Sequence, residues 1–362
     1  MNRALIAAAG TGGHIFPALA VAETLRNDGW QVDWLGTREG RLESRVIPAA
    51  GFSLHSISMT GVRGHGLLRK LKMPLVLAKA VLQCRRLLKQ LQPNVVVTFG
   101  GYVCAPMGIA AKMMGIPLLV HEQNAVPGMT TRLLAPRATN VFLGLPVATP
   151  QWRQYSVVGN PLRQAFTEVV KTHQEDKSIA GPITILVVGG SLGAKVLNEQ
   201  VPQAVQQLVD VELNVVHQCG QGNEASTKAA YAGAEVISSL AVHEFIDDMA
   251  SEFAKADLVI CRAGALTVSE LAAVGVASIL VPLPHAVDDH QTANAKVLES
   301  CGAALLMPQK ELENGALAIH LKRLLHDRQQ LWTMARFARE RGMPEATQRL
   351  ANECKRFEKS DD

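Results

Sequence analysis

The stretch AAGTGGHIFPAL, residues Ala8–Leu19, continues a short apolar run, Ala4–Ala9, close to the amino end of the chain. A glycine-rich turn after a buried strand lets backbone N–H groups approach a phosphate, and the helix that follows adds its partial positive charge. A histidine, His14, stands directly behind the glycines. The stretch therefore predicts a strand, a phosphate-type turn and a helix over Pro17–Asn27, with an imidazole beside the point where a phosphate would bind.

The same pattern occurs again in the second half of the chain. The apolar run Ile183–Val188 leads into GGSLGA, as LIAAAG leads into GTGGH, and further short apolar runs alternate with helical stretches in both halves. Continuous apolar strands separated by helices indicate parallel sheets that are covered on both faces. A chain of 362 residues is long enough for two such units. We therefore predict an α/β protein of two Rossmann-like, doubly wound domains.

The join between the two domains is predicted near YSVVGNP, Tyr155–Pro161, where glycine and proline interrupt an otherwise apolar run. The first domain would then cover residues 1–160 and the second residues 161–339. The last helical stretch, Gln329–Lys359, is rich in arginine and has no strand after it.

The composition excludes several classes of protein. The six cysteines are scattered and form no C-x-x-C pair, so we expect reduced thiols and neither a disulfide framework nor a zinc site. No D-x-D occurs, and we predict no bound metal and no cofactor. The amino-terminal run LIAAAG is too short for a signal peptide, and Gln90–Ala111 is interrupted by proline and glycine, so no segment is expected to cross a bilayer.

Charge is distributed unevenly along the chain. Residues 1–163 contain 18 Lys and Arg but 6 Asp and Glu, and no acidic residue lies between Glu43 and Glu122. Within this region, Arg69–Gln90 carries seven basic side chains among leucines and valines. A basic, amphipathic segment without acids is typical of contact with an anionic membrane surface, and a solvated basic face or an ordinary crossover helix are the alternatives. Nucleic acid is not expected as a partner, because aromatic residues make up only 4% of the chain.

Three glycine-rich turns follow predicted strands: GTGGH at Gly10–His14, GGYV at Gly100–Val103 and GGSLG at Gly189–Gly193. In open α/β sheets, ligands bind outside the carboxyl ends of the strands, so such turns in duplicated units favour a ligand with a diphosphate. A nicotinamide dinucleotide is one candidate. However, the third glycine of G-x-G-x-x-G is missing, and Asp33 lies inside its predicted strand rather than at its end.

The stretch DLVICRAGALTVSEL, Asp257–Leu271, predicts a strand, a glycine turn and a helix that begins near Leu266. Glu270 would lie in about the first turn of this helix. There its carboxylate could accept hydrogen bonds from ribose hydroxyls, or it could cap the helix. The amides of Ala265–Thr267 would face a phosphate.

His14 also has two interpretations, as a hydrogen-bonded structural residue or as a base that takes a proton near neutral pH. Without a metal, a departing diphosphate would have to be stabilised by backbone amides, helix ends and Arg163.

Eight motifs between Gly10 and Ala295 together carry a family resemblance: GTGGHIFPALA, GGYV, HEQNAVPG, VVGNPLR, GGSLGA, EFIDDM, CRAGALTVSEL and DDHQTANA. The eight motifs occur once each, in this order, and together they cover both halves of the chain. On these motifs the chain resembles the MurG family of peptidoglycan N-acetylglucosaminyltransferases. The resemblance implies a glycosyltransferase B-type fold, with two domains facing across a cleft and the last helix, about residues 340–362, packing back on the first domain.

The resemblance also implies an activity. Members of this family transfer N-acetylglucosamine from UDP-N-acetylglucosamine, with inversion, to the 4-hydroxyl of the muramoyl sugar of lipid I, and so form lipid II. They act as peripheral proteins at the cytoplasmic face of the cell membrane. We therefore expect the first domain to take the lipid acceptor and the second the UDP-sugar, with proteins of the cell-wall and division machinery as further possible partners.

The residues that match the family's motifs are the expected site residues. His14 would be the general base. The remaining matches would contact the donor, with Ile246 at the uracil and Glu270 at the ribose: Thr11, Gly12, Gly13, Asn124, Arg163, Ser191, Ile246, Ala265, Leu266, Thr267, Val268, Ser269, Glu270 and Gln291.

Three other functions remain open at this point. A UDP-sugar epimerase on the same type of fold would need no lipid acceptor and no basic apolar segment. A nicotinamide-dependent oxidoreductase would bind NADH rather than UDP. A nucleotide-sugar sensor would bind UDP-N-acetylglucosamine without consuming it.

Overall fold

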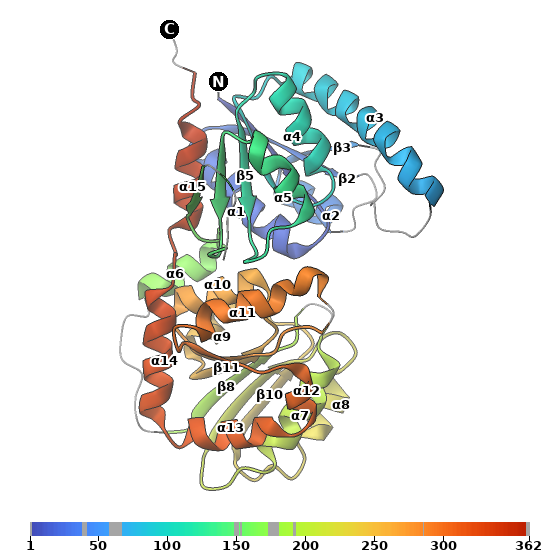
Figure 1. Cartoon of the computed structure of the whole chain (residues 1–362). Helices are drawn as coiled ribbons and strands as arrows, with labels where there is room; N and C mark the ends of the chain where they lie inside the picture. Colours follow the sequence, from blue (N-terminus) through green and yellow to red (C-terminus); the bar gives the residue numbers. More distant parts are fainter. Residues whose placement is uncertain are drawn as a thin grey trace. The chain divides into compact units, whose positions relative to one another are not determined.

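The computed structural model describes residues 2–37, 42–57, 67–147, 152, 154–172, 181–190, 193–284 and 286–359. The chain forms two compact units: the first comprises Met1–Arg163 with Glu345–Asp362, and the second Gln164–Pro344 (Figure 1). The sequence prediction placed the join between residues 160 and 161 and grouped the last helix with the first domain.

The first unit is built on a seven-stranded parallel sheet with the order β3-β2-β1-β4-β5-β6-β7. The chain starts in the middle of this sheet, and β1 lies between β2 and β4, with Leu5 level with both Asp33 and Val96. This is the Rossmann strand order with one more strand at the edge. The strands are β1 (Arg3–Ala8), β2 (Gln31–Thr37), β3 (Ser53–Ile57), β4 (Val95–Gly100), β5 (Leu118–Glu122), β6 (Asn140–Leu143) and β7 (Tyr155–Val157).

Helices cover both faces of this sheet, which explains why its central strands are apolar on both sides. Ile6 of β1 belongs to one core cluster together with residues of the first and last helices, whereas Leu5 belongs to another beside α3 and α4. The helices are α1 (Gly12–Asn27), α2 (Glu43–Ala49), α3 (Leu67–Leu91), α4 (Cys104–Met113), α5 (Met129–Leu134), the 3₁₀ turn η1 (Ala135–Arg137) and α15 (Ala346–Lys355).

The last helix, α15, packs on α1 of the first unit (Figure 1). Leu350 and Cys354 are fully buried in the core that α1 covers. Two side-chain contacts hold the helix at its carboxyl end: Lys355 Nζ lies 2.6 Å from Asp28 Oδ2, and Trp30 Nε1 donates to Glu358 Oε1 at 3.2 Å. The end of the chain therefore belongs to the same core as its beginning.

The second unit has a six-stranded parallel sheet with the order β10-β9-β8-β11-β12-β13, the same Rossmann order. Its strands are β8 (Ile183–Val188), β9 (Leu213–Gln218), β10 (Ile237–His243), β11 (Leu258–Cys261), β12 (Ala277–Leu280) and β13 (Ala304–Leu306). Its helices are α6 (Gln164–Thr172), α7 (Lys195–Val205), α8 (Glu224–Ala230), α9 (Met249–Lys255), α10 (Ala265–Val274), η2 (Val287–Asp289), α11 (His290–Glu299), α12 (Gln309–Glu313), α13 (Ala316–Leu325) and α14 (Arg328–Glu340). The predicted fold of two doubly wound α/β domains is confirmed.

Local features differ from the prediction in two places. Helix α1 begins at Gly12 rather than near Pro17, because Thr11 is extended and its carbonyl oxygen accepts from the N–H of Ile15, so the glycines form the first turn. The strands β3 and β7 were not predicted. Both lie at edges of the sheet and are partly exposed, so they lack the continuous apolar run of the central strands.

Candidate functional site

The predicted residues of the first unit all follow the carboxyl ends of strands in one sheet. Thr11–His14 follow β1, Asn124 follows β5, and Arg163 follows β7. From β1 the strand order proceeds to β2 and β3 on one side of the sheet, and from β4 it proceeds to β5, β6 and β7 on the other side. The carboxyl ends of the neighbouring strands β1 and β4 therefore form the switch point, where ligands of such sheets bind.

His14 lies at this switch point with a defined ring orientation. Its Nδ1 is 3.2 Å from the carbonyl oxygen of Ala9, which can only accept, so Nδ1 carries the proton and the lone pair is on Nε2. The ring packs against Gly100 at the end of β4, where an added Cβ would lie 2.7 Å from His14 Cδ2. The side chain is half-buried. A neutral imidazole held in this way can accept a proton at Nε2.

The glycine turn of the first unit is also linked to Arg163. A Cβ on Gly12 would lie 2.9 Å from Cε2 of Phe16, so the aromatic ring stands directly against the turn. The guanidinium of Arg163 lies over the same ring, 6.0 Å from its centroid. The contact with Phe16 therefore places the permanent positive charge of Arg163 near the amino end of α1. The first backbone N–H groups at that end have no partner within the helix.

The loop that carries Asn124 is organised by a residue that sequence reasoning missed, the buried Glu122. Its carboxylate accepts from the backbone N–H of Asn124 at 3.0 Å, the N–H of Gly128 at 2.9 Å and the hydroxyl of Thr131 at 2.6 Å. Glu122 lies inside the HEQNAVPG motif, but no neighbouring residue in the sequence indicates that its carboxylate organises the loop. This carboxylate is an anchor of the loop.

In the second unit the predicted residues again follow carboxyl ends of strands. Ile246 comes after β10, Ala265–Glu270 after β11, and Gln291 after β12. Ser191 lies outside the described residues, but Gly190 and Gly193 on either side of it are described. The strands β10, β8, β11 and β12 belong to one parallel sheet. These segments therefore all lie at the side of the sheet where its strands have their carboxyl ends.

The glycine turn after β8 is held by Gln218 at the end of β9, a second residue that sequence reasoning missed. Its side-chain oxygen accepts from the N–H of Gly190 at 3.0 Å, and its Nε2 donates to the carbonyl of Gly190 at 3.0 Å and to that of Glu244 at 2.9 Å. Gln218 thus ties this turn to the segment that carries Ile246.

Helix α10 begins with Ala265 after Gly264, whose extended backbone (φ −65°, ψ 145°) places it at the N-cap. Gly264 has no side chain with which to cap this end, and the first turn contains no acidic residue. Glu270 therefore lies in the second turn of α10 rather than in about the first, and its role as a ribose ligand or as a helix cap stays a prediction. The amides of the first turn point out of the helix end, as an anion site requires.

Two neighbouring side chains hold this helix end and the loop after β12. Asn294 is fully buried and donates from Nδ2 to the carbonyl of Ala263 at 3.2 Å. The Gln291 side-chain oxygen accepts from the N–H of Leu283 at 2.9 Å, so its NH₂ group is the part that could donate to a ligand. Arg262 donates to the carbonyls of Val281 and Pro282, which makes it a structural cation rather than a phosphate ligand.

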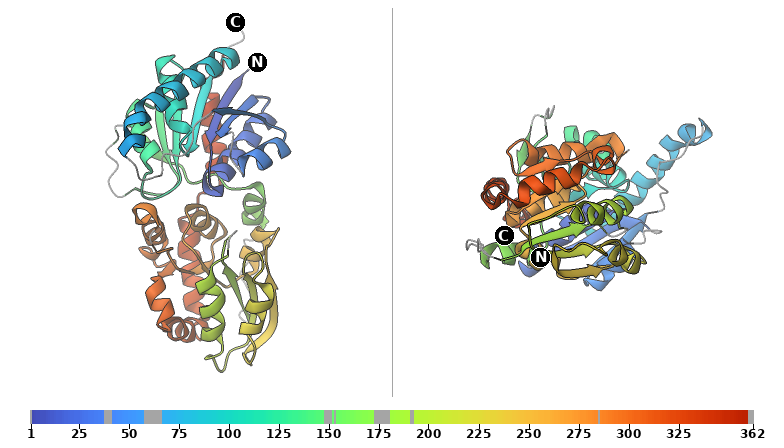
Figure 2. Two further views of the ribbon diagram at one scale, coloured as in Figure 1. Left: turned by 90° about the vertical axis from the view of Figure 1, so that its right-hand side faces the viewer. Right: turned by 90° about the horizontal axis from the view of Figure 1, so that it is seen from below.

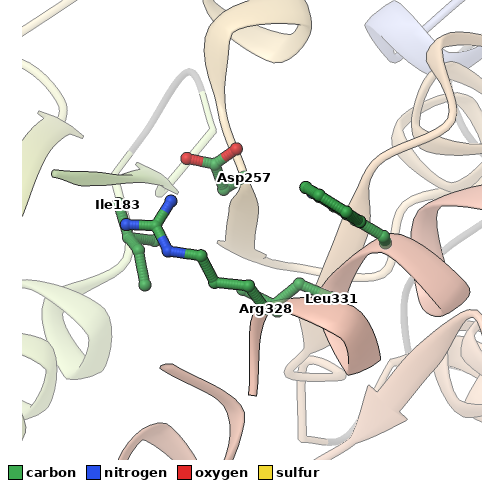
Figure 3. Close-up of a pocket in the computed structure, with 5 residues that line it drawn as sticks. Ile183, Asp257, Arg328 and Leu331 are labelled. Carbon is green, nitrogen blue, oxygen red and sulfur yellow. The ribbon is translucent and has the colours of Figure 1, made fainter. Parts of the chain in front are cut away.

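A small pocket lies on the opposite side of the second sheet, at the amino ends of its strands. It is lined by Ile183, Asp257, Arg328, Leu331 and Trp332, at the amino ends of β8 and β11 (Figure 3). Asp257 accepts there from the N–H of Thr184 at 2.8 Å, and Arg328 donates to the carbonyl of Gly181. These contacts stabilise the strand ends, and the pocket is remote in the fold from the glycine turns.

Among the described residues, no three His, Cys, Asp or Glu side chains are grouped so that they could hold a metal ion. In the same part of the chain, no helix is both long enough and apolar enough to span a bilayer.

The basic helix α3 leaves apolar side chains exposed. From Ala80 onward it packs on the sheet, but Leu75 is 74% exposed, and its amino-terminal part extends away from the rest of the first unit (Figures 1 and 2). The neighbouring helices α4 and α5 add more such residues. We define the apolar surface by the exposed side chains of these three helices: Met73, Leu75, Val76, Leu82, Met113, Met129 and Leu133.

Known proteins resemble the chain over its whole length. It matches the glycosyltransferase family 28 N-terminal domain over residues 4–143 and the C-terminal domain of that family over residues 184–350. A protein of Idiomarina loihiensis named UDP-N-acetylglucosamine--N-acetylmuramyl-(pentapeptide) pyrophosphoryl-undecaprenol N-acetylglucosamine transferase is 74% identical over 362 residues, covering 100% of both chains.

Two further comparisons agree. A protein of the same name from Aeromonas hydrophila is 51% identical and covers 98% of this chain and 96% of its own. The crystal structure of Acinetobacter baumannii MurG superposes with a TM-score of 0.86 at 43% identity, covering 98% of this chain and 100% of that one.

Proposed function

The chain belongs to glycosyltransferase family 28, in its MurG branch, and we propose that it transfers N-acetylglucosamine from UDP-N-acetylglucosamine to lipid I. The observation that carries the proposal is the pair of switch points. Each unit presents a glycine turn and a helix amino end at the carboxyl ends of its central strands. The acceptor and the donor of this reaction are both diphosphates, which such ends bind.

We assign the donor to the second unit. The amides at the start of α10 and the turn at Gly190–Gly193 would contact the diphosphate, Glu270 the ribose and Ile246 the uracil. Gln218 supports this assignment, because it ties the turn to the segment before Ile246. The NH₂ group of Gln291 would donate to the sugar, since its oxygen is held by Leu283.

We assign the acceptor and the proton transfer to the first unit. His14 Nε2 takes the proton of the 4-hydroxyl as that oxygen attacks the anomeric carbon of the donor sugar. The bond from the anomeric carbon to the diphosphate breaks in the same step, and UDP leaves with the electron pair. A single displacement of this kind inverts the anomeric centre, and the orientation of His14 by the Ala9 carbonyl supports its role as the base.

The negative charge of the departing UDP needs stabilisation as it develops. Preorganised amides and fixed positive charges do this well because they need little rearrangement during the reaction. We assign this role to the amino end of α10 and to Arg163. Thr11, Gly12, Gly13 and Asn124 would complete the donor contacts on the first unit.

We further propose that the first unit rests on an anionic membrane surface at the cytoplasmic face, where a lipid-linked acceptor is available. The apolar surface on α3, α4 and α5 supports this, because the same three helices also carry exposed cations, among them Lys79, Arg86, Lys89, Lys112 and Arg132. An ordinary crossover helix would bury such residues on its sheet.

Release of UDP tests the proposed function. The purified protein is incubated with UDP-N-acetylglucosamine, with and without lipid I, and free UDP and sugar products are measured. We expect UDP to appear only with the acceptor, together with a disaccharide-linked lipid. An isomerised UDP-sugar without acceptor would indicate an epimerase, and binding without consumption would indicate a sensor.

A further inference from the structure

A chain of buried polar side chains in the second unit has no part in the assignments above. It joins Tyr231 after α8, His217 on β9 and Asn198 on α7. Tyr231 Oη lies 2.9 Å from His217 Nδ1, and His217 Nε2 lies 3.1 Å from Asn198 Oδ1. His217 is fully buried, and Tyr231 and Asn198 are nearly so.

The direction of these hydrogen bonds is fixed by the last acceptor. Asn198 Nδ2 donates to the carbonyl oxygen of Cys219 at 2.9 Å, and a carbonyl can only accept. Asn198 must therefore present its oxygen to His217, so Nε2 carries the proton and Nδ1 accepts from the Tyr231 hydroxyl. Burial lowers the pKa of His217 to about 4, which keeps the ring neutral at physiological pH as this arrangement requires.

The last acceptor lies against the glycine turn. A Cβ on Gly193 would be 2.3 Å from the Cys219 carbonyl oxygen, and Gly193 has a φ of +72° that favours glycine. The N–H of Gly193 donates to the carbonyl of Gly190 at 2.9 Å, which closes the turn. Asn223 Nδ2 also approaches the Cys219 oxygen, at the longer distance of 3.3 Å.

We propose that His217 is a positioning residue for the UDP-sugar. Through Asn198 it fixes the Cys219 carbonyl, and through that carbonyl it fixes the Gly190–Gly193 turn that receives the diphosphate. This inference rests on the proposed function, because it takes the turn to be part of the donor site. Gln218 holds the start of the turn. The hydrogen-bonded side chains of Tyr231, His217 and Asn198 hold its end through the Cys219 carbonyl.

The surroundings of His217 favour this role over simple core packing. The residues that share its face of β9, Leu213 and Val215, are buried aliphatic side chains. An aliphatic residue at position 217 would continue that cluster without a buried imidazole, and burying such a polar ring is costly unless its hydrogen bonds are made. The hydrogen-bonded side chains of Tyr231, His217 and Asn198 instead hold the Cys219 carbonyl, beside the glycine turn, in one orientation.

Binding of UDP and steady-state kinetics test the proposal. The His217→Leu variant should bind UDP about tenfold more weakly and show a higher KM for UDP-N-acetylglucosamine, with a smaller change in kcat, since one buried hydrogen-bond partner is lost. The His217→Gln variant keeps a donor near the position of Nε2 and should recover affinity to within about threefold of the wild type. Wild-type UDP affinity in His217→Leu would overturn the proposal.

A matched control separates positioning from stability. Val215→Ala removes buried volume from the same face of β9 and should lower the thermal midpoint without changing UDP affinity. Amide hydrogen exchange over residues 189–194 gives a readout without ligand: it should be faster in His217→Leu than in Val215→Ala at matched stability. Equal exchange in the two variants would contradict the proposal, whereas a wild-type protein that fails to bind UDP would contradict the proposed function instead.

Discussion

Gly100 and His14 are in direct contact across the switch point of the first sheet: a Cβ on Gly100 would lie 2.7 Å from Cδ2 of the imidazole. Gly100 ends β4 and His14 follows β1, and these neighbouring strands are far apart in sequence. Together with the Ala9 carbonyl, Gly100 defines where the ring lies and which nitrogen carries its lone pair. The glycine turns of this unit therefore position the imidazole as well as providing amides for a phosphate.

Substitution of Gly100 tests this contact. Gly100→Ala should displace the imidazole and reduce turnover about tenfold or more, because misplacing a catalytic group by a fraction of an ångström is costly. UDP affinity should change little, since the contacts to the uracil and the ribose are assigned to the second unit. Gly115→Ala is the control: Gly115 also has a positive φ, +70°, but no atom lies within 4 Å of an added Cβ. Equal effects of the two substitutions on turnover would show that the contact with His14 is irrelevant.

Removal of the imidazole tests the general base. His14→Ala should lower kcat by about 10² to 10⁴, the usual contribution of general-base catalysis, and should leave UDP affinity close to that of the wild type. Turnover with lipid I and calorimetric binding of UDP measure the two effects separately. The exposed His326 offers a control, and His326→Ala should behave as wild type. Normal turnover of His14→Ala would remove His14 from the mechanism.

The carboxylate on α10 should contribute to nucleotide affinity. Glu270→Gln replaces a charged acceptor for the ribose hydroxyls by a neutral one, and UDP affinity should fall about tenfold or more. Titration calorimetry with UDP measures the change. Glu299→Gln, at an exposed position on the neighbouring helix α11, is the charge-matched control. If both variants bind UDP equally well, Glu270 does not contact the ribose.

Charge reversal tests membrane association. Replacing Lys79, Arg86 and Lys89 by glutamate should weaken binding to anionic vesicles more than about a hundredfold, because each basic residue at such a surface contributes about 1 kcal/mol. Vesicle sedimentation measures the effect, and neutral vesicles should show little difference. Reversal of Lys322 and Arg323, which are exposed on the second unit, is the control. Unchanged binding of the triple variant would rule out contact through α3.

Two buried histidines predict acid sensitivity. Burial lowers the pKa of His121 and of His217 to about 4, whereas an unfolded histidine titrates near 6.5. Between these values the unfolded chain binds more protons, so the free energy of unfolding should fall as the pH falls from about 6.5 to about 4, by on the order of 3 kcal/mol per histidine. Thermal midpoints across this range measure it. His217→Gln should flatten the dependence, and a dependence equal to that of the wild type would contradict the account.

The sequence was sufficient to predict the fold because its central strands are buried on both faces. Runs such as Ala4–Ala9 are apolar and buried throughout, and that pattern is typical of parallel sheets covered by helices. The edge strands β3 and β7 gave no such signal, because partly exposed strands have mixed composition. The start of α1 was placed too late because glycines, which usually end helices, here form its first turn.

The candidate site was predictable only where local motifs carried it. His14 and the α10 segment follow glycine turns, so their positions could be read from the chain. Glu122 and Gln218 act through hydrogen bonds to loops whose geometry depends on the folded chain, and a single sequence does not display such contacts. Likewise, the orientation of His14 depends on Gly100, a contact between residues 86 positions apart.

A crystal structure with UDP-N-acetylglucosamine bound would show where the donor lies. We expect its diphosphate to accept hydrogen bonds from amides of the Gly190–Gly193 turn and of the first turn of α10, with the ribose at Glu270. A nucleotide bound away from both segments, or a diphosphate held through a metal ion, would contradict this expectation.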